Sequence, residues 1–201
     1  MSVKDSKTEQ LIKNTAKRIF LSEGKMLATT QDIADAAGVN RSLLHYYFRS
    51  RDVLFDQVFK EALVKLRERL LSIMVSKDLF RSKIESFINI FFEELTDVPY
   101  LEAFIILQLN KDASKYEEFF TSFSGHEEKN ANFLAEIKLE MDKGTIPEMK
   151  PLQFFINLFS LMAYPFAAKT LYEKMFNLDE QEYTNLMNER KKLILSLLFK
   201  K

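Results

Sequence analysis

Apolar residues recur at three- and four-residue intervals along nearly the whole chain, which is typical of helices with one buried face. The first such face is formed by Leu11, Ile12, Thr15, Ala16, Ile19 and Phe20. A short second pattern ends at Gly38, a third runs from Arg41 to Phe48, and a long fourth runs from Leu54 to about Val75. Further helices are predicted over residues 79–96, 100–110, 114–123, 127–143, 152–176 and 180–199. Because no segment alternates with the period of a strand, the pattern predicts an all-α fold.

One proline interrupts the most apolar stretch of the sequence. This stretch runs from Phe154 to Ala168 and contains Pro165. A proline inside a helix removes one backbone hydrogen bond and costs about 3 kcal/mol, so we expect a kink or a break near Ala163–Tyr164. The stretch also falls short of the ~20 apolar residues that a membrane-spanning helix needs. It is therefore interpreted as a buried helix.

Charge and composition add to this picture. The chain has 29 basic and 29 acidic residues, but the segment 1–60 carries 10 basic and 7 acidic side chains. This mild excess of positive charge favours contact with an anion. Cysteine is absent, which excludes disulfides, thiolate metal sites and cysteine nucleophiles. The segment from Met1 to Ser6 contains no apolar run of the signal-peptide kind, so we expect a cytoplasmic protein.

Residues Thr29 to Ser42 have the order of side chains that a helix-turn-helix requires. A threonine can cap the first helix, and Ala37 is small enough for two helices to cross closely. Gly38 supplies the positive φ angle of a tight turn, and Asn40 can cap the second helix. The second helix is expected to bury Leu44, Tyr47 and Phe48 and to expose Arg41, Ser42, Leu43, His45 and Tyr46. Such side chains at the start of a helix suit the major groove of DNA.

The segment from Thr30 to Leu54 resembles the TetR (tetracycline-repressor) family of transcriptional regulators. It reads TQDIADAAGVNRSLLHYYFRSRDVL, and the family pattern is roughly T-x-x-x-I-A-x-x-A-G-V-S-x-x-x-[LI]-Y-x-[HY]-F-x-[SN]-K-x-x-L. The match is dense from Leu11 to Phe55, and beyond Lys60 the resemblance is only in length and helical content. It implies a three-helix DNA-binding head over residues 1–52 and a helical ligand-binding and dimerisation domain over residues 53–201.

The resemblance also implies which residues contact DNA. Thr30 matches a phosphate contact, and Gln31 matches a position that can touch a base. Leu43 replaces a frequent threonine and can meet a thymine methyl, while His45 replaces a usual tyrosine and either donates to phosphate or lies unengaged at the surface. Arg51 replaces a lysine and can fork onto a phosphate, so we expect it to keep that role. The full predicted set is Thr30, Gln31, Arg41, Ser42, Leu43, His45, Tyr46 and Arg51.

Phenylalanine is concentrated in the remainder of the chain, where 15 of the 19 lie beyond residue 60. Their spacing predicts that several converge inside a helical bundle. Two interpretations stay open, a plain phenylalanine-rich core or an apolar ligand cavity of the kind that helical regulatory domains of this family enclose. The residues assigned to such a cavity are Phe87, Phe91, Phe104, Gln108, Phe133, Phe155, Phe159 and Met162.

These features together predict a ligand-responsive transcriptional regulator, most often a repressor in this family. By resemblance, a homodimer formed through the last two helices binds a near-palindromic double-stranded DNA operator, with half-sites about 34–36 Å apart. A small apolar or amphipathic ligand then releases it. No catalytic residue, metal or cofactor is predicted, because glycine-rich phosphate loops, G-x-S-x-G and H-E-x-x-H are absent. The alternative is a helical small-molecule-binding protein or enzyme that does not bind DNA.

Overall fold

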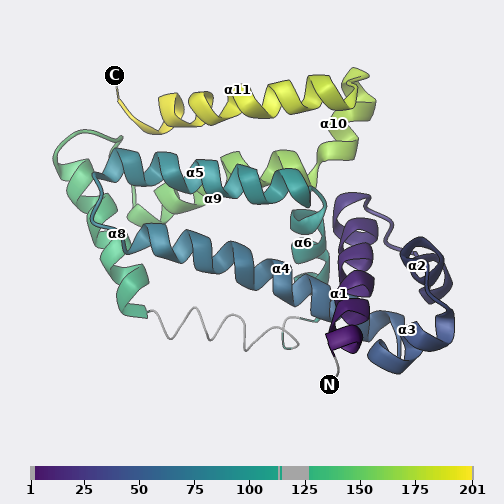
Figure 1. Cartoon of the computed structure of the whole chain (residues 1–201). Coiled ribbons are helices and arrows are strands. Elements are labelled where there is room, and N and C mark those ends of the chain that lie inside the picture. Colours follow the sequence, from purple (N-terminus) through teal and green to yellow (C-terminus); the bar gives the residue numbers. More distant parts are fainter. Residues whose placement is uncertain (1–2, 113, 115–126, 201) are drawn as a thin grey trace. The chain divides into compact units, whose positions relative to one another are not determined.

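The computed structural model describes residues 3–112, 114 and 127–200, and every regular element within them is a helix (Figure 1). The all-α prediction is therefore confirmed. The helix predicted over 114–123 lies, apart from Ser114, outside the described residues. The described elements are α1 (Val3–Lys17), its π-helical continuation η1 (Arg18–Ser22), α2 (Thr30–Ala37), α3 (Arg41–Phe48), α4 (Arg51–Met74), α5 (Phe80–Asp97), α6 (Leu101–Lys111), α8 (Glu127–Asp142), α9 (Pro151–Ala167), α10 (Lys169–Phe176) and α11 (Glu180–Leu198).

The chain divides into two compact units. Unit 1 contains the chain up to Lys65 together with Asp97–Leu101, and unit 2 contains Leu66–Thr96 and the chain from Glu102 onward. Helix α4 contributes residues to both units, because it runs without interruption from Arg51 to Met74. The predicted functional division between residues 52 and 53 stays a prediction.

Unit 1 is built on the packing of α1 against α2 and of α2 against α3. The inward positions predicted for α2, Ile33, Ala34 and Ala37, are buried. Phe20 of η1 meets Phe55 of α4 edge to face, with ring centroids 5.2 Å apart. The core of this unit therefore draws on α1, α2, α3 and the first turns of α4. Its most deeply buried side chains include Ile12, Ala16, Phe20, Ile33, Ala34, Leu44, Phe48 and Leu54.

A short distant segment, Asp97–Leu101, completes unit 1. The backbone N–H of Tyr100 donates to the carbonyl of Leu21 over 3.1 Å, and the Ser22 hydroxyl donates to the carbonyl of Asp97 over 2.6 Å. Gly24 has a φ of +66°, and a Cβ there would lie 2.8 Å from the Tyr100 ring. Glycine is thus required at this position both by the backbone conformation and by the close approach of the ring.

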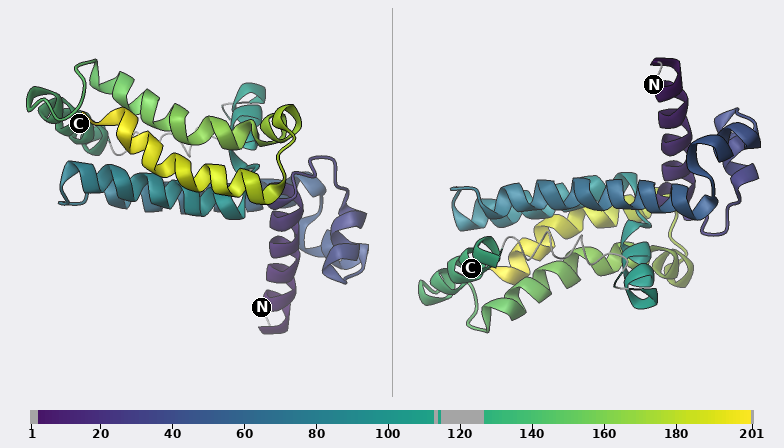
Figure 2. Two further views of the ribbon diagram at one scale, coloured as in Figure 1. Left: turned by 90° about the horizontal axis from the view of Figure 1, so that it is seen from above. Right: turned by 90° about the horizontal axis from the view of Figure 1, so that it is seen from below.

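Helix α5 contacts its neighbours in unit 2 on several sides, and nine of its 18 residues are buried. Phe87 and Phe91 meet Phe159 of α9 edge to face, at centroid distances of 5.6 and 5.9 Å. The ammonium group of buried Lys83 donates to both carboxylate oxygens of Glu136 on α8, over 2.9 and 2.6 Å. Two further views show α5, α9 and α11 running side by side (Figure 2). This arrangement encloses an apolar core rich in phenylalanine.

The predicted break at Pro165 is present, but it lies later in the chain than expected. Helix α9 continues through Pro165 to Ala167, and α10 follows at an angle of 64°. Proline lacks the N–H that would bond to the carbonyl of Leu161, four positions earlier. Arg190 of α11 supplies the missing donor, because its Nε lies 2.8 Å from that carbonyl oxygen. The helix can therefore complete its last turn before it bends, instead of breaking at 163–164.

The apolar α9 does not meet the length that a transmembrane helix requires. Within the described ranges, no single helix is both long and apolar enough to cross a membrane. The bent pair α9 and α10 passes a test of length and composition only when the two helices are taken together.

Candidate nucleic-acid interface

The helix-turn-helix is held by caps that local sequence accounts for. Thr29 accepts from the N–H of Asp32 through its hydroxyl, and its own N–H donates to the Asp32 carboxylate over 2.7 Å. The bonds that the N–H and the hydroxyl of Thr29 donate to the Asp32 carboxylate lower the pKa of Asp32. Gly38 adopts the left-handed conformation that ends α2, with φ of 67°. Asn40 accepts the N–H of Leu43 over 2.7 Å and so caps α3. The capping and turn roles predicted for Gly38 and Asn40 are confirmed.

Helix α3 exposes most of the side chains that the sequence predicts. Arg41, Ser42, His45 and Tyr46 are exposed, and Leu44 and Phe48 are buried. Two assignments are wrong, since Leu43, expected to be exposed, and Tyr47, expected to be buried, are both half-buried. In a helix with 3.6 residues per turn, these two positions lie on the same flank, between the buried and the exposed faces. The ring of Tyr47 fills this flank against Tyr46 and Phe48.

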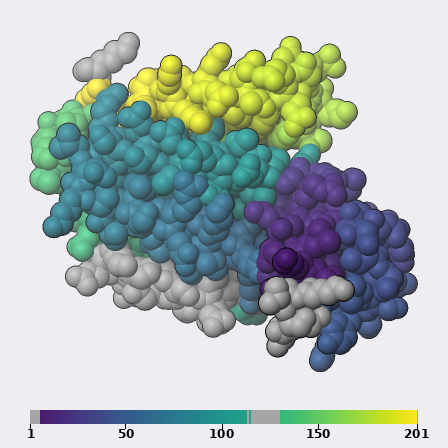
Figure 3. All heavy atoms as spheres, viewed as in Figure 1, coloured from purple at the N-terminus to yellow at the C-terminus, as the bar shows by residue number. Residues whose placement is uncertain are grey.

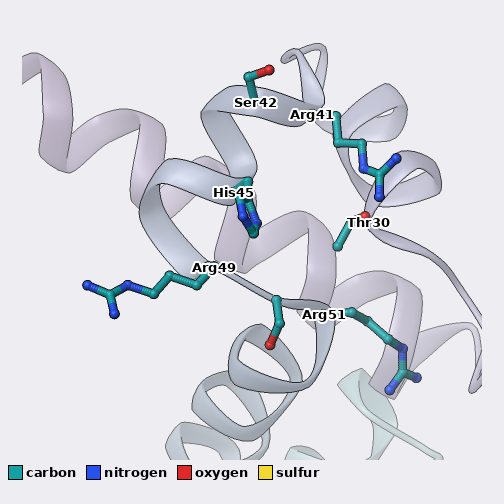
Figure 4. A pocket seen from close by; sticks show the side chains of 7 residues that line it. Thr30, Arg41, Ser42, His45, Arg49 and Arg51 are labelled. Carbon is teal, nitrogen blue, oxygen red and sulfur yellow. The ribbon is translucent and has the colours of Figure 1, made fainter.

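A hollow of about 470 Å³ opens between the start of α2, the outer face of α3 and the start of α4. Three arginines and a histidine line it, and none of its described lining residues carries a carboxylate. The close-up shows His45, Thr30 and the guanidinium of Arg41 near one another, whereas Arg49 and Arg51 extend away from them (Figure 4). Cationic and hydroxyl donors in this arrangement suit phosphate oxygens. The lining residues are Thr30, Arg41, Ser42, His45, Arg49, Ser50 and Arg51.

The hollow gathers five of the eight predicted DNA-binding residues and leaves three outside. Gln31, Leu43 and Tyr46 do not line it. Gln31 is exposed and its side-chain amide donates to Asp35 over 2.7 Å, one turn further along α2. Tyr46 is 75% exposed on the outer face of α3. These three side chains are thus placed on the surface beside the hollow.

Sequence reasoning missed two lining residues, Arg49 and Ser50. Arg49 ends α3 with a positive φ of 58°. This φ is uncommon for residues other than glycine, so the sequence does not predict it. Ser50 accepts the N–H of Val53 over 3.2 Å, as a cap of α4. A serine immediately before a long apolar helical pattern is a recognised capping signal, so Ser50 could have been found.

Comparison with known proteins agrees with this geometry. The model of the family described as "Bacterial regulatory proteins, tetR family" matches residues 12–58, the segment that forms the helix-turn-helix. The HTH-type transcriptional regulator BetI of Rhizobium meliloti (strain 1021) is 29% identical over 79 residues. This alignment spans 39% of each chain, so the match covers about two fifths of that relative. The segment 12–58 is therefore a helix-turn-helix region of the TetR type.

Solved structures extend the likeness to the whole fold. The TetR-family regulator PfmR of Thermus thermophilus has a TM-score of 0.63 at 17% identity, over 92% of this chain and 96% of that one. The ketosteroid transcriptional regulator KstR2 of Mycobacterium tuberculosis has a TM-score of 0.62 at 15% identity, over 100% and 97%. The fatty acid degradation regulator FadR of Bacillus halodurans has a TM-score of 0.60 at 20% identity, over 93% and 94%.

The phenylalanine-rich part of the chain forms a connected set of rings in unit 2. Phe155 and Phe159 are half-buried, with centroids 4.8 Å apart, and Phe155 meets the buried ring of Phe133 at 6.2 Å. Phe87 and Phe91 join through Phe159. The predicted convergence of these residues is confirmed. Among the other residues assigned to a ligand cavity, Phe104 and Met162 are buried and Gln108 is half-buried; their role in ligand binding stays a prediction.

An apolar face is exposed on the last helices of unit 2, of which α10 and α11 lie at the surface in the space-filling view (Figure 3). Along α11, Ile194 and Leu198 are buried inside the chain, whereas Leu186, Leu193 and Leu197 are each about half exposed. The exposed apolar residues of this face are Leu152, Ile156 and Tyr164 on α9, Leu171, Met175 and Phe176 on α10, and Leu186, Leu193 and Leu197 on α11.

No metal site is found in the part of the chain that the structure describes. Among residues 3–112, 114 and 127–200, no group of three histidine, aspartate or glutamate side chains lies close enough to hold a metal ion.

Proposed function

We propose that this TetR-family protein is a ligand-responsive transcriptional regulator that binds operator DNA through α2 and α3. The observation that carries the proposal is the cationic hollow, where Thr30, Arg41 and His45 meet at the exposed face of a capped helix-turn-helix and no described lining residue is acidic. Phosphate contacts supply most of the affinity of such proteins and fix their register on DNA.

The side chains divide between two roles in this proposal. Thr30, Arg41 and His45 contact phosphate, because their donors share the hollow. Tyr46 and Leu43 read base edges or thymine methyl groups from the outer face of α3, since short helices of this kind present their first turns to the major groove. Ser42 and Gln31 complete the contact set of this proposal, which leaves out Arg51, the eighth residue predicted by resemblance.

A homodimer through the last two helices is part of the proposal. The exposed apolar face of α9 and α11 supports it, because half-exposed leucines along one helix are costly in water and gain from burial against a second copy. Two copies related by a twofold axis would present two α3 helices to a near-palindromic operator.

The ligand proposed for unit 2 is small and apolar or amphipathic. The connected rings of Phe87, Phe91, Phe133, Phe155 and Phe159 support this chemistry, because they provide an apolar lining once a ligand separates them. KstR2 and FadR, which share the fold, are named for ketosteroid and fatty acid regulation. Binding that favours a state unsuited to the operator would release DNA. The proposal, following the resemblance, is that the protein is a cytoplasmic repressor.

A gel-shift assay tests the DNA-binding proposal directly. The full-length protein is mixed with DNA flanking its own gene, with excess nonspecific competitor, at two salt concentrations. A specific complex that weakens as salt rises is expected, and Arg41→Ala and Tyr46→Ala should abolish it. Lys77→Ala, which removes an exposed cation from the loop after α4, should leave it unchanged.

A negative result with that DNA leads to selection from random DNA, because regulators can act on distant genes. If neither experiment yields a sequence-specific complex, the proposal is wrong. The alternative of a small-molecule-binding protein or enzyme without DNA binding would then replace it.

A further inference from the structure

Arg51, the first residue of α4, directs its guanidinium group toward the loop that precedes α2. Its Nε donates to the carbonyl of Ala28 over 3.0 Å, and its Nη2 donates to the carbonyl of Met26. Its Nη1 lies 2.9 Å from the carboxylate of Asp52. All three nitrogens therefore have acceptors within unit 1. Two of these acceptors are backbone carbonyls of the loop before α2, and α2 and α3 separate this loop from Arg51 in the sequence.

The surroundings of Arg51 keep this geometry in place. The guanidinium carbon lies 5.0 Å from the ring centroid of Phe20 and 5.7 Å from that of Phe55. Only 31% of the side chain is exposed. A planar guanidinium can lie against aromatic rings and at the same time fork onto two carbonyls, and a lysine ammonium cannot reproduce both contacts. The close-up accordingly shows Arg51 pointing away from Thr30, Arg41 and His45 (Figure 4).

The loop that Arg51 holds leads directly into the DNA-facing end of α2. Met26 and Ala28 are followed by Thr29, whose capping box with Asp32 starts the helix, and then by Thr30 in the cationic hollow. A bond to the carbonyls of this loop thus sets where the first turn of α2 lies relative to the start of α4.

We propose that Arg51 is a positioning residue, which clamps the loop Met26–Ala28 to α4 and thereby places Thr30 for phosphate, rather than a phosphate ligand itself. This inference rests on the proposed DNA-binding function. It differs from the role expected by resemblance, in which the side chain at this position contacts the DNA backbone. It also assigns a function to the change from lysine to arginine, because only arginine supplies the fork and the flat face.

Amide hydrogen exchange in the DNA-free protein tests the clamp. Arg51→Lys keeps the charge but loses the fork, so exchange at the hydrogen-bonded amides of Thr29, Asp32 and Ile33 should become at least about tenfold faster, the equivalent of one lost charge-assisted hydrogen bond. Arg49→Lys is the matched control, because this neighbouring arginine lines the same hollow; it should leave these amides unchanged. Exchange at the amides of α5 reports whether the whole protein has been destabilised.

Salt dependence of DNA binding separates positioning from direct contact. Arg51→Lys and Arg51→Gln should both weaken the operator complex by about tenfold, without changing the slope of log affinity against log salt. If Arg51 contacted phosphate, the lysine variant would keep its affinity, and the glutamine variant would lower the magnitude of the slope by about one.

The two proposals fail in different ways. Unchanged exchange at the amides of Thr29, Asp32 and Ile33 in Arg51→Lys overturns the clamp whatever the DNA result, and so does a reduced salt slope in Arg51→Gln. A wild-type protein that binds no operator overturns the DNA-binding function. The exchange experiment still decides in that case whether Arg51 holds the loop.

Discussion

Glu102, the second residue of α6, carries a carboxyl group that is only 9% exposed. Burial disfavours its charged form and raises its pKa to about 7. The unfolded chain ionises near the ordinary value of about 4.3. Folding is therefore favoured by the neutral carboxyl at low pH, and this contribution is lost as pH rises from about 4.3 through the folded pKa near 7.

Replacing Glu102 by Gln should remove this dependence on pH. The variant is expected to be more stable than the wild type at pH 7, by up to about 3 kcal/mol, and equally stable near pH 4. Urea unfolding at both pH values measures the difference. The gain in stability of the variant over the wild type is compared at the two pH values. If this gain were no larger at pH 7 than at pH 4, the carboxyl would be ionised without penalty in the folded protein.

The turn of the helix-turn-helix makes a second demand on a single residue. Gly38 has a φ of +67°, and no atom of the described chain lies within 4 Å of the position a Cβ would take. The requirement for glycine is therefore conformational. Gly38→Ala should lower the free energy of unfolding by about 1–2 kcal/mol, and Gly38→Asn by less, because asparagine tolerates the left-handed region. Equal stability of the alanine variant and the wild type in urea unfolding would contradict this account.

The sequence could predict the roles of residues whose contacts lie within a few positions of them along the chain. Gly38 and Asn40 act on backbone groups within a few positions of themselves. The contacts of Arg51 with Met26 and Ala28 join positions separated by the whole helix-turn-helix. No local pattern encodes such a pairing, so the sequence supported only a phosphate contact at Arg51.

Prediction from local sequence has the same limit for whole helices. Periodicity placed most of them closely, as for α5, predicted over 79–96 and found over Phe80–Asp97. The exception is the segment predicted as one helix over 152–176, which the structure divides into α9 and α10. The position of that division depends on Arg190, which belongs to another helix. A pattern along one segment cannot supply this information.

The stabilising effect of Arg190 should depend on the proline. Arg190→Met removes the donor to the Leu161 carbonyl and should cost about 1–3 kcal/mol. In a Pro165→Ala background the restored N–H can serve that carbonyl, so the same change should cost less. A double-mutant cycle in urea measures the coupling between the two positions. Additive losses would mean that Arg190 stabilises the protein through other contacts.

The proposed dimer is a property of the whole molecule. If the exposed face of α9 and α11 joins two copies, a charge in it must be buried without a partner, which opposes assembly. Leu193→Glu is therefore expected to convert a dimer into a monomer. Leu139→Glu on α8 is the matched control, because Leu139 is 52% exposed and Leu193 is 49% exposed. Sedimentation velocity over a range of concentrations distinguishes the two outcomes, and a dimeric Leu193→Glu variant would place the interface elsewhere.

The resemblance implied the order of the two functional parts along the chain. It could not show which residues belong to each compact unit. Residues 97–101 lie well beyond the head in sequence, and yet they belong to unit 1. They are joined to it by hydrogen bonds to the Leu21 carbonyl and from the Ser22 hydroxyl, which leave no signal in the hydrophobic pattern.

This return of the chain has a consequence for the transfer of heads between regulators. A fragment ending at Lys65 would carry every residue of the helix-turn-helix but would lack Tyr100, the ring that covers Gly24. A chimera joined once within α4 would take the stretch that corresponds to Asp97–Leu101 from the other regulator. The residue at the position of Tyr100 would then be the one that the other regulator has there. An exchange that preserves unit 1 needs the stretch Asp97–Leu101 to travel with the head, so the gene segments that encode unit 1 are discontinuous.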